Sequence, residues 1–125
     1  MSGIRFRRTS GQGSKYHSVK IETEDGKFDS KAEYRRWLTL KSLAEEGAII
    51  DLKRQVKYPL IGSSRRKTKL KNGRTLELAI SYVADFVYIK NGELVVEDVK
   101  GFKTDVYVIK RKLMLEKYGI EIQEV

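Results

Sequence analysis

The chain has 125 residues, with 26 Lys and Arg against 17 Asp and Glu, so its formal charge at neutral pH is +9. This is the length of one domain, and 40% hydrophobic residues are enough to bury a core without cross-links. The absence of Cys and the single His exclude disulfide frameworks, Cys nucleophiles, zinc fingers and histidine-rich metal sites. Oxygen ligands would have to hold any metal, which favours Mg²⁺ or Mn²⁺.

The positive charge is segregated along the chain. Residues 1–20 carry five Lys and Arg, residues 53–74 carry nine, and neither segment contains an acid. Acids outnumber bases in the remaining segments, 21–52 and 75–125. Such separation favours a polyanionic partner, with DNA as the expected one, over an incidental basic surface.

No apolar run approaches the length of about 18 residues that a membrane span requires. The first residues also lack the apolar segment of a signal peptide. We therefore expect a cytoplasmic protein without a membrane partner.

The first half of the chain is expected to hold one helix and one strand. Residues 1–20 are rich in Gly and Ser without apolar periodicity, which predicts a flexible basic arm. Ser30 and Glu33 form a capping box before an apolar pattern, which predicts a helix over 31–46 that ends at Gly47. A strand is predicted over 54–61, and the basic residues 62–74 then predict a surface loop or small hairpin.

The second half predicts a hairpin, a helix and a last strand. Two β-rich runs, 82–90 and 93–100, flank Asn91-Gly92, a dipeptide typical of two-residue hairpin turns. Thr104 is expected to begin a helix that runs to Tyr118. Its predicted buried residues are Val106, Ile109, Leu113 and Met114. Residues 120–125 alternate like a strand, so the order α-β-β-β-α-β predicts one α/β domain over 21–125, with helices flanking a mixed sheet.

The predicted hairpin register brings two carboxylates together. A two-residue turn at 91–92 opposes Asp85 to Asp98 and residue 83 to Lys100, on an apolar hairpin face with Val83, Val87, Ile89 and Val96. Glu97 points to the other face, beside Phe86. A divalent cation between the carboxylates would relieve their repulsion and could polarise a phosphodiester for hydrolysis. The alternative is a solvated face on which Lys100 only pairs with Asp98.

These residues resemble a nuclease motif. Asp85, an intervening hairpin and Asp98-Val99-Lys100 are similar to the D…(D/E)-x-K pattern of the PD-(D/E)XK superfamily, which has a restriction-endonuclease-like αβββαβ core. One departure is Ala84, which stands where the motif's proline would be. A family of small phage and prophage proteins in that superfamily is a closer resemblance. It rests on Lys15-Tyr16-His17, Phe28-Asp29-Ser30-Lys31-Ala32-Glu33, Tyr82 to Phe86, Val96 to Thr104, and Tyr107.

The resemblance implies roles for particular residues. Asp85, Asp98 and the backbone carbonyl of Val99 would bind Mg²⁺ or Mn²⁺, and Lys100 would be the catalytic lysine. Glu33 has two interpretations. It could complete only the helix cap, or it could be a catalytic metal ligand, as the first-helix glutamate is in Holliday-junction resolvases and in Tn7-like transposase endonucleases.

Other candidates surround this set. Gln55 could face the site or be buried against backbone. Tyr107 and Lys110, one helical turn apart, could touch a phosphate, although a core position is the alternative for Tyr107. Glu97 is a further candidate, and His17 could contact nucleic acid. The expected DNA-binding residues are Arg65, Arg66, Lys67, Lys69, Lys71, Lys103 and Lys110.

The sequence thus predicts a metal-dependent DNA endonuclease, with a branched phage DNA such as a Holliday junction as substrate by analogy. Two alternatives stay open: a non-catalytic nucleic-acid-binding module, and an accessory nuclease subunit of a larger phage or transposition complex. The protein could be a monomer or a homodimer. If a phage encodes it, the expected compartment is the host cytoplasm.

Overall fold

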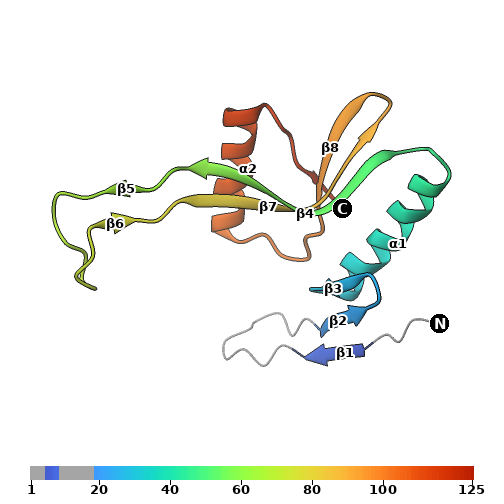
Figure 1. The fold of residues 1–125 in the computed structure, drawn as a ribbon, viewed down its shortest axis with the longest axis horizontal. Helices are drawn as coiled ribbons and strands as arrows, with labels where there is room; N and C mark the ends of the chain where they lie inside the picture. Colours follow the sequence, from blue (N-terminus) through green and yellow to red (C-terminus); the bar gives the residue numbers. More distant parts are fainter. Residues whose placement is uncertain (1–4, 9–18) are drawn as a thin grey trace. The chain divides into compact units, whose positions relative to one another are not determined.

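The structure is a computed structural model that describes residues 5–8 and 19–125. The chain forms two compact units, one up to Ile50 and one from Asp51, and each is described by itself (Figure 1). No helix among the described residues has the length and apolar character needed to cross a membrane.

The first unit combines a three-stranded antiparallel sheet with one helix. Its strands are β1 (Arg5–Arg8), β2 (Val19–Thr23) and β3 (Gly26–Phe28), in that order across the sheet, and its helix is α1 (Lys31–Glu45). Ile21 and Phe28 are paired across β2 and β3 and are both buried. The ring of Phe28 also lies 5.0 Å from that of Tyr34 on α1. Cross-strand apolar pairs of this kind hold a small sheet to its helix.

The predicted flexible arm is wrong where the structure describes it. Residues 5–8 form β1, and residues 19–20 belong to β2. The alternation of Val19–Thr23 and the turn dipeptide Asp25-Gly26 are the sequence signals of the β2–β3 hairpin that sequence reasoning passed over. The remainder of the predicted arm, including His17, lies outside the described residues.

Helix α1 begins and ends where the sequence predicts, to within one residue. The Ser30 hydroxyl accepts a hydrogen bond from the backbone N–H of Glu33 at 3.1 Å, which satisfies a free donor of the first turn. The Glu33 carboxylate in turn accepts from the backbone N–H of Asp29 at 3.0 Å. Gly47 follows the helix with φ +81°, a left-handed conformation that glycine adopts without steric cost.

The second unit is built on a mixed four-stranded sheet. Its strands are β4 (Ile50–Ile61), β7 (Ile80–Lys90), β8 (Glu93–Asp98) and β9 (Gln123–Glu124), in the order β4-β7-β8-β9. Strands β7 and β8 are antiparallel, whereas β8 and β9 are parallel. Helix α2 (Asp105–Tyr118) packs on β7. Two short strands, β5 (Ser64–Arg65) and β6 (Leu76–Glu77), continue the β4–β7 pair outward as a hairpin (Figure 1).

The predicted α/β class and the order α-β-β-β-α-β are confirmed, with the additional strands inserted around that order. A surface loop or a small hairpin was predicted for the basic residues 62–74, and the structure has the hairpin, formed by β5 and β6. The last strand is much shorter than the predicted 120–125, because only Gln123–Glu124 pair with β8.

The turn between β7 and β8 has the predicted form. Asn91 and Gly92 have φ values of 52° and 79°, the two left-handed residues of a primed turn. The register runs from Lys90↔Glu93 to Phe86↔Glu97, as a two-residue turn requires.

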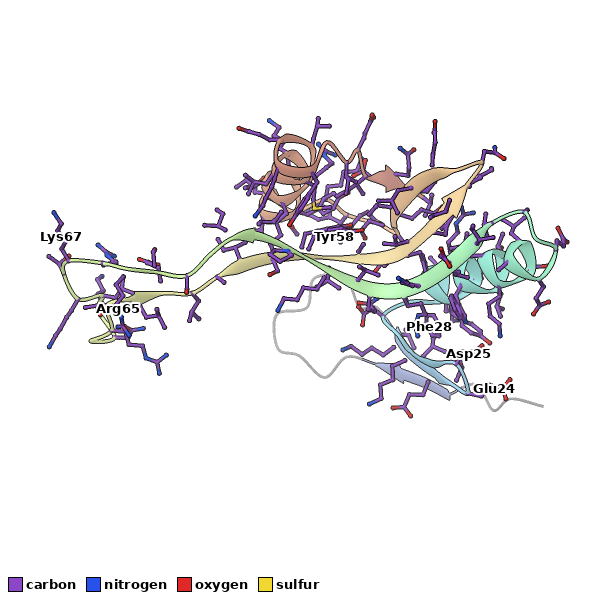
Figure 2. All side chains as sticks on the ribbon, turned by 45° about the horizontal axis from the view of Figure 1, so that its top comes forward. Glu24, Asp25, Phe28, Tyr58, Arg65 and Lys67 are labelled. Carbon is purple, nitrogen blue, oxygen red and sulfur yellow. The ribbon has the colours of Figure 1, made fainter. Side chains whose placement is uncertain are left out.

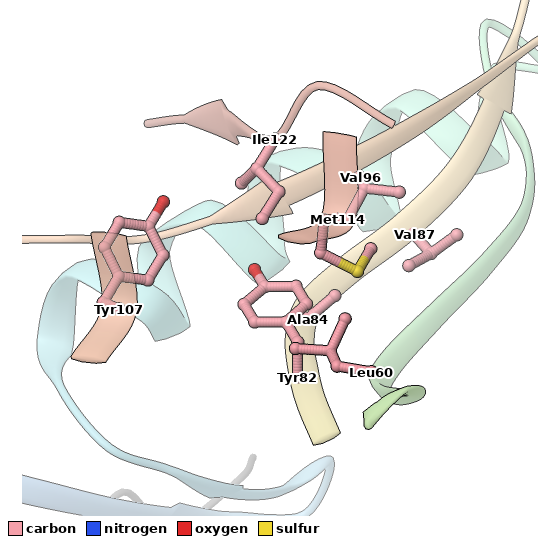
Figure 3. Close-up of a cluster of buried hydrophobic side chains, with 8 residues drawn as sticks. All are labelled: Leu60, Tyr82, Ala84, Val87, Val96, Tyr107, Met114 and Ile122. Atoms are coloured by element: carbon pink, nitrogen blue, oxygen red, sulfur yellow. The ribbon is translucent and has the colours of Figure 1, made fainter. Parts of the chain in front are cut away.

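The core of this unit lies between α2 and the sheet (Figure 3). Its buried residues are Leu60, Tyr82, Ala84, Val87, Val96, Tyr107, Met114 and Ile122. The predicted burial of Val106 and Ile109 is wrong, since they are 60% and 57% exposed. Apolar residues occur nearly all round α2, so periodicity alone does not select one face. The face that packs carries Tyr107 and Met114, seven residues apart.

Candidate functional site

The alternation of side chains along β7 changes phase just before the site. Tyr82 and Ala84 share a core cluster with Val87 and Val96, so residues of even and odd number lie on the same side of β7. A local irregularity of this kind re-aims side chains, as β-bulges do. Val83, predicted on the apolar face, is 45% exposed. The β7–β8 register accordingly stops at Phe86↔Glu97, short of the predicted pairs of Asp85 with Asp98 and of Val83 with Lys100.

Asp85 and Asp98 nevertheless come together at the end of β8. One carboxylate oxygen of Asp85, Oδ2, accepts a hydrogen bond from the backbone N–H of Val99 at 2.9 Å. The other, Oδ1, accepts from the Gln55 side-chain amide at 3.3 Å. Burial, followed by a hydrogen bond with Asp98 and its negative charge, raises the pKa of Asp85 to about 7. The Val99 N–H and Lys100 act in the opposite direction without cancelling that shift.

Asp98 is held from two sides and is only 2% exposed. The hydroxyl of Tyr82 donates to Oδ2 at 2.7 Å, and Lys100 Nζ lies 3.4 Å from Oδ1. The backbone carbonyl of Asp98 also accepts from the N–H of Val125, next to β9. Both carboxylate oxygens therefore have fixed partners, so the orientation of this side chain is set before any ligand arrives.

Lys100 lies between Asp98 and an aromatic ring. Its Nζ is 4.6 Å from the centroid of Tyr107, a distance at which a cation is attracted to the ring face. Tyr107 is 6% exposed, which confirms the core interpretation, and burial followed by Glu124 raises the pKa of its hydroxyl. Tyr107 thus contacts the site through its ring, which lies next to Lys100.

Gln55 reaches the site through an unusual backbone conformation. Its φ of 52° is left-handed, which is rare for a residue with a Cβ and is often found at functional sites. The side chain donates to Asp85, so the structure favours the interpretation in which Gln55 faces the site.

Two other candidate acids have different partners. Glu97 is 2% exposed, and its carboxylate accepts a short hydrogen bond from the Tyr88 hydroxyl, on the face opposite Asp98 as predicted. Glu33 belongs to the first unit and is 3% exposed, with its carboxylate at the start of α1. Its capping contact is confirmed, and its role as a metal ligand stays a prediction.

Tyr82 is the residue that sequence reasoning missed. Strict alternation places it on the opposite face of β7 from Asp85, and nothing in the run Tyr82 to Phe86 marks the change of phase. The available signal was a Tyr within an apolar strand, because a Tyr that becomes buried normally finds a polar partner for its hydroxyl.

The predicted DNA-binding residues fall into two groups. Arg65, Arg66, Lys67, Lys69 and Lys71 lie together on the β5–β6 hairpin and are exposed. Lys103 instead pairs with Glu124 at 3.3 Å, an ion pair that Arg111 shares at 3.1 Å. Lys110 is half-buried on α2.

The donor set fits a divalent cation that keeps part of its water. Among residues 19–125, no group of three or more Asp, Glu or His side chains is gathered closely enough to hold a metal ion. Mg²⁺ is commonly bound by only one or two carboxylates, with water and substrate phosphate as its other ligands. Asp85 and Asp98 are such a pair, and a cation between them would oppose the burial and the negative charge of Asp98 that raise the pKa of Asp85.

The chain was compared with known proteins. Neither the curated proteins nor the solved structures gave a match. Residues 13–123 match a protein family described as "Protein of unknown function (DUF1064)". That segment covers all but the two ends of the chain, and it includes Gln55, Asp85, Asp98 and Lys100. The chain therefore belongs to the DUF1064 family.

Proposed function

We propose that this protein is a metal-dependent DNA endonuclease of the PD-(D/E)XK type that acts in the cytoplasm, or in the host cytoplasm if a phage encodes it. The observation that carries the proposal is the placement of Asp85 next to the buried Asp98: Asp85 accepts from the Val99 N–H at 2.9 Å, and Lys100 Nζ lies 3.4 Å from Asp98 Oδ1. A buried and a half-buried carboxylate beside a lysine are costly for stability, so a role in chemistry accounts for them better than a role in folding.

Each residue would have a distinct part in hydrolysis. Lys100 would donate to a non-bridging phosphate oxygen and stabilise the charge that develops as water attacks phosphorus. Tyr82 and the Val99 N–H would hold the two carboxylates in place, as they do without substrate. Gln55 would orient Asp85 from β4. Hydrolysis adds water across the ester, so one new P–O bond replaces the P–O bond that breaks.

Asp85, Asp98 and the carbonyl of Val99 would hold Mg²⁺ or Mn²⁺, with Glu33 as the further ligand that the resemblance implies. When bound, the cation would supply positive charge that polarises the phosphodiester and makes water a better nucleophile.

The test is cleavage by the purified protein. Supercoiled plasmid, single-stranded DNA and a four-way junction are each incubated with Mg²⁺, Mn²⁺ or EDTA. We expect cleavage that needs the divalent ion, and a loss of at least about a hundredfold in Asp98→Asn and Lys100→Ala, because each removes a group that acts in the transition state. Preferred cleavage of the junction would support a branched substrate.

A matched control distinguishes the loss of a catalytic group from the loss of one negative charge. Glu93→Gln removes one carboxylate from the exposed end of the same hairpin and should leave cleavage unchanged. If wild type, Asp98→Asn and Glu93→Gln all bind DNA and none cleaves, the non-catalytic binding module becomes the better explanation. Cleavage that appears only when a larger complex is present would favour the accessory subunit.

A further inference from the structure

The hairpin beyond β4 and β7, which we call the basic hairpin (residues 62–79), is a defined two-stranded ribbon. Ser64 pairs with Glu77 and Arg65 with Leu76. The ribbon continues through the hydrogen bond from Arg66 N–H to the Thr75 carbonyl at 2.8 Å. At its end, the Leu70 N–H donates to the Arg74 carbonyl at 2.7 Å, and Gly73 turns the chain with φ +82°.

The basic hairpin carries a dense positive charge. Its sequence holds six Lys and Arg against one acid, Glu77, which lies 3.6 Å from Arg66. Arg65 donates to the Thr75 hydroxyl at 3.1 Å. The other four cations, Lys67, Lys69, Lys71 and Arg74, are exposed and have no ion pair with any residue in 19–125. Figure 2 shows Lys67 at the far end of the ribbon, with its side chain directed away from it. Like charges at this density repel one another, and a bound polyanion would offset that repulsion.

The composition of the basic hairpin favours duplex DNA over other polyanions as its partner. Proteins that hold single strands stack bases on aromatic rings, and residues 62–79 contain no Phe, Tyr or Trp. Elements that lie on anionic membranes are typically helices with an apolar face, whereas the basic hairpin is a β-ribbon. Its cations fall within residues 65–74, where Leu70 is the one apolar side chain, and Leu76 and the exposed Leu78 follow them. A two-stranded β-ribbon also matches the major groove of B-DNA, which is about 12 Å wide.

We propose that the basic hairpin binds duplex DNA by lying in the major groove, with its lysines and Arg74 against the phosphates on either side. This inference rests on the proposed function for its partner and adds the kind of substrate. Contacts to phosphate carry no sequence information, so the hairpin would position duplex DNA without selecting a sequence.

Binding is measured in EDTA, so that cleavage has no part in the readout. The probes are a labelled duplex of about 20 base pairs, one of its single strands, and vesicles of anionic phospholipid, each over a range of KCl concentrations. The test variant carries Lys67→Gln, Lys69→Gln and Lys71→Gln. We expect duplex affinity to fall at least about tenfold, and the slope of log affinity against log salt to decrease by about 2 to 3.

The control variant has the same net charge as the test variant. It carries Lys53→Gln, Lys90→Gln and Lys112→Gln, three exposed positions outside the basic hairpin. It should lose less than about threefold in affinity and keep the salt slope, since only local charge would matter. Circular dichroism would verify that both variants are folded.

A chemical probe tests the groove itself. Dimethyl sulfate methylates guanine N7, which faces the major groove. Wild type should protect guanines in the duplex, and the Lys67/Lys69/Lys71 variant should not. Equal loss in both triple variants, equal binding of duplex and single strand, binding to vesicles as tight as to duplex, or no N7 protection would each overturn the inference. Tight, hairpin-dependent duplex binding by a protein that never cleaves would uphold it while removing the proposed nuclease activity.

Discussion

The hydroxyl of Tyr82 fixes the orientation of Asp98. It is buried and donates to Oδ2 at 2.7 Å, and a hydrogen bond to a charged acceptor contributes about 1.5–3 kcal/mol. We expect Tyr82→Phe to lower the free energy of unfolding by about 1–3 kcal/mol in urea denaturation, because it leaves one oxygen of a buried carboxylate without its donor. Cleavage should also fall, since the carboxylate would be held less firmly.

Tyr34→Phe is the matched control for this change. Its ring packs on Phe28, and its hydroxyl has no hydrogen bond with any of residues 19–125, so the control removes an oxygen without removing a buried contact. If the two variants changed the free energy of unfolding equally, Tyr82 would be a packing residue and not a positioning residue.

The pKa of Asp85 predicts how stability changes with pH in the absence of metal. Its pKa in the folded protein, about 7, is above its ordinary value of 3.8, so the folded state binds the proton more tightly than the unfolded state does. This contribution to stability is complete below about pH 4 and is lost as the pH rises through 7. We therefore expect the melting temperature in EDTA to fall between pH 5 and pH 8 by more in wild type than in Asp85→Asn.

At pH 8 in EDTA, Asp85→Asn should be more stable than wild type, by an amount on the order of 1–3 kcal/mol. An asparagine keeps an oxygen for the Val99 N–H and carries no charge against Asp98. The difference between the two proteins isolates this group from all others that titrate. A parallel pH dependence in both would show that Asp85 does not bind the extra proton.

Among the elements, the β7–β8 hairpin could be predicted from its turn to Phe86↔Glu97, whereas the part of β7 before Phe86 could not. Asn91-Gly92 determines a two-residue turn, and the turn determines the register down to Phe86↔Glu97. The approach of Asp85 and Asp98 was predicted by counting along that register. Tyr82 was not, because a change of phase within β7 depends on how the strand packs against α2 and not on local sequence.

Helix α2 shows the same limit. Thr104 and Gly119 predict its ends, since a cap depends on one or two residues. Its buried face depends on the sheet it meets. With apolar residues at positions on several sides, the packing of Tyr107 and Met114 selects a face that leaves Val106 exposed.

The turn itself can be tested by substitution. Gly92 has φ +79° and open space where a Cβ would lie, so Gly92→Ala adds conformational strain without a clash. We expect it to lower the free energy of unfolding by about 1 kcal/mol. Gly62→Ala, also in open space but with an ordinary φ, should be neutral or slightly stabilising. An equal loss in both variants would show that the turn conformation contributes nothing to stability.

At the scale of the whole molecule, the charge of +9 conceals two opposite regions. The cations gathered on the basic hairpin would bring a polyanion to the protein, whereas Asp85 and Asp98 would repel it. An acidic pair facing a phosphodiester is unfavourable unless a cation stands between them. The proposed function therefore requires that the metal bind before, or together with, the nucleic acid.

This requirement predicts that divalent ions stabilise the protein without DNA. A ligand present at a hundred times its Kd raises the free energy of unfolding by about 2.7 kcal/mol. We expect Mg²⁺ or Mn²⁺ to raise the melting temperature at pH 8, which is above the pKa of Asp85, and expect NaCl of equal ionic strength to have no such effect. Asp98→Asn should lose the shift, and Glu93→Gln should retain it. A shift that survived in Asp98→Asn would place the ion elsewhere, and no shift in wild type would remove the metal from the proposed mechanism.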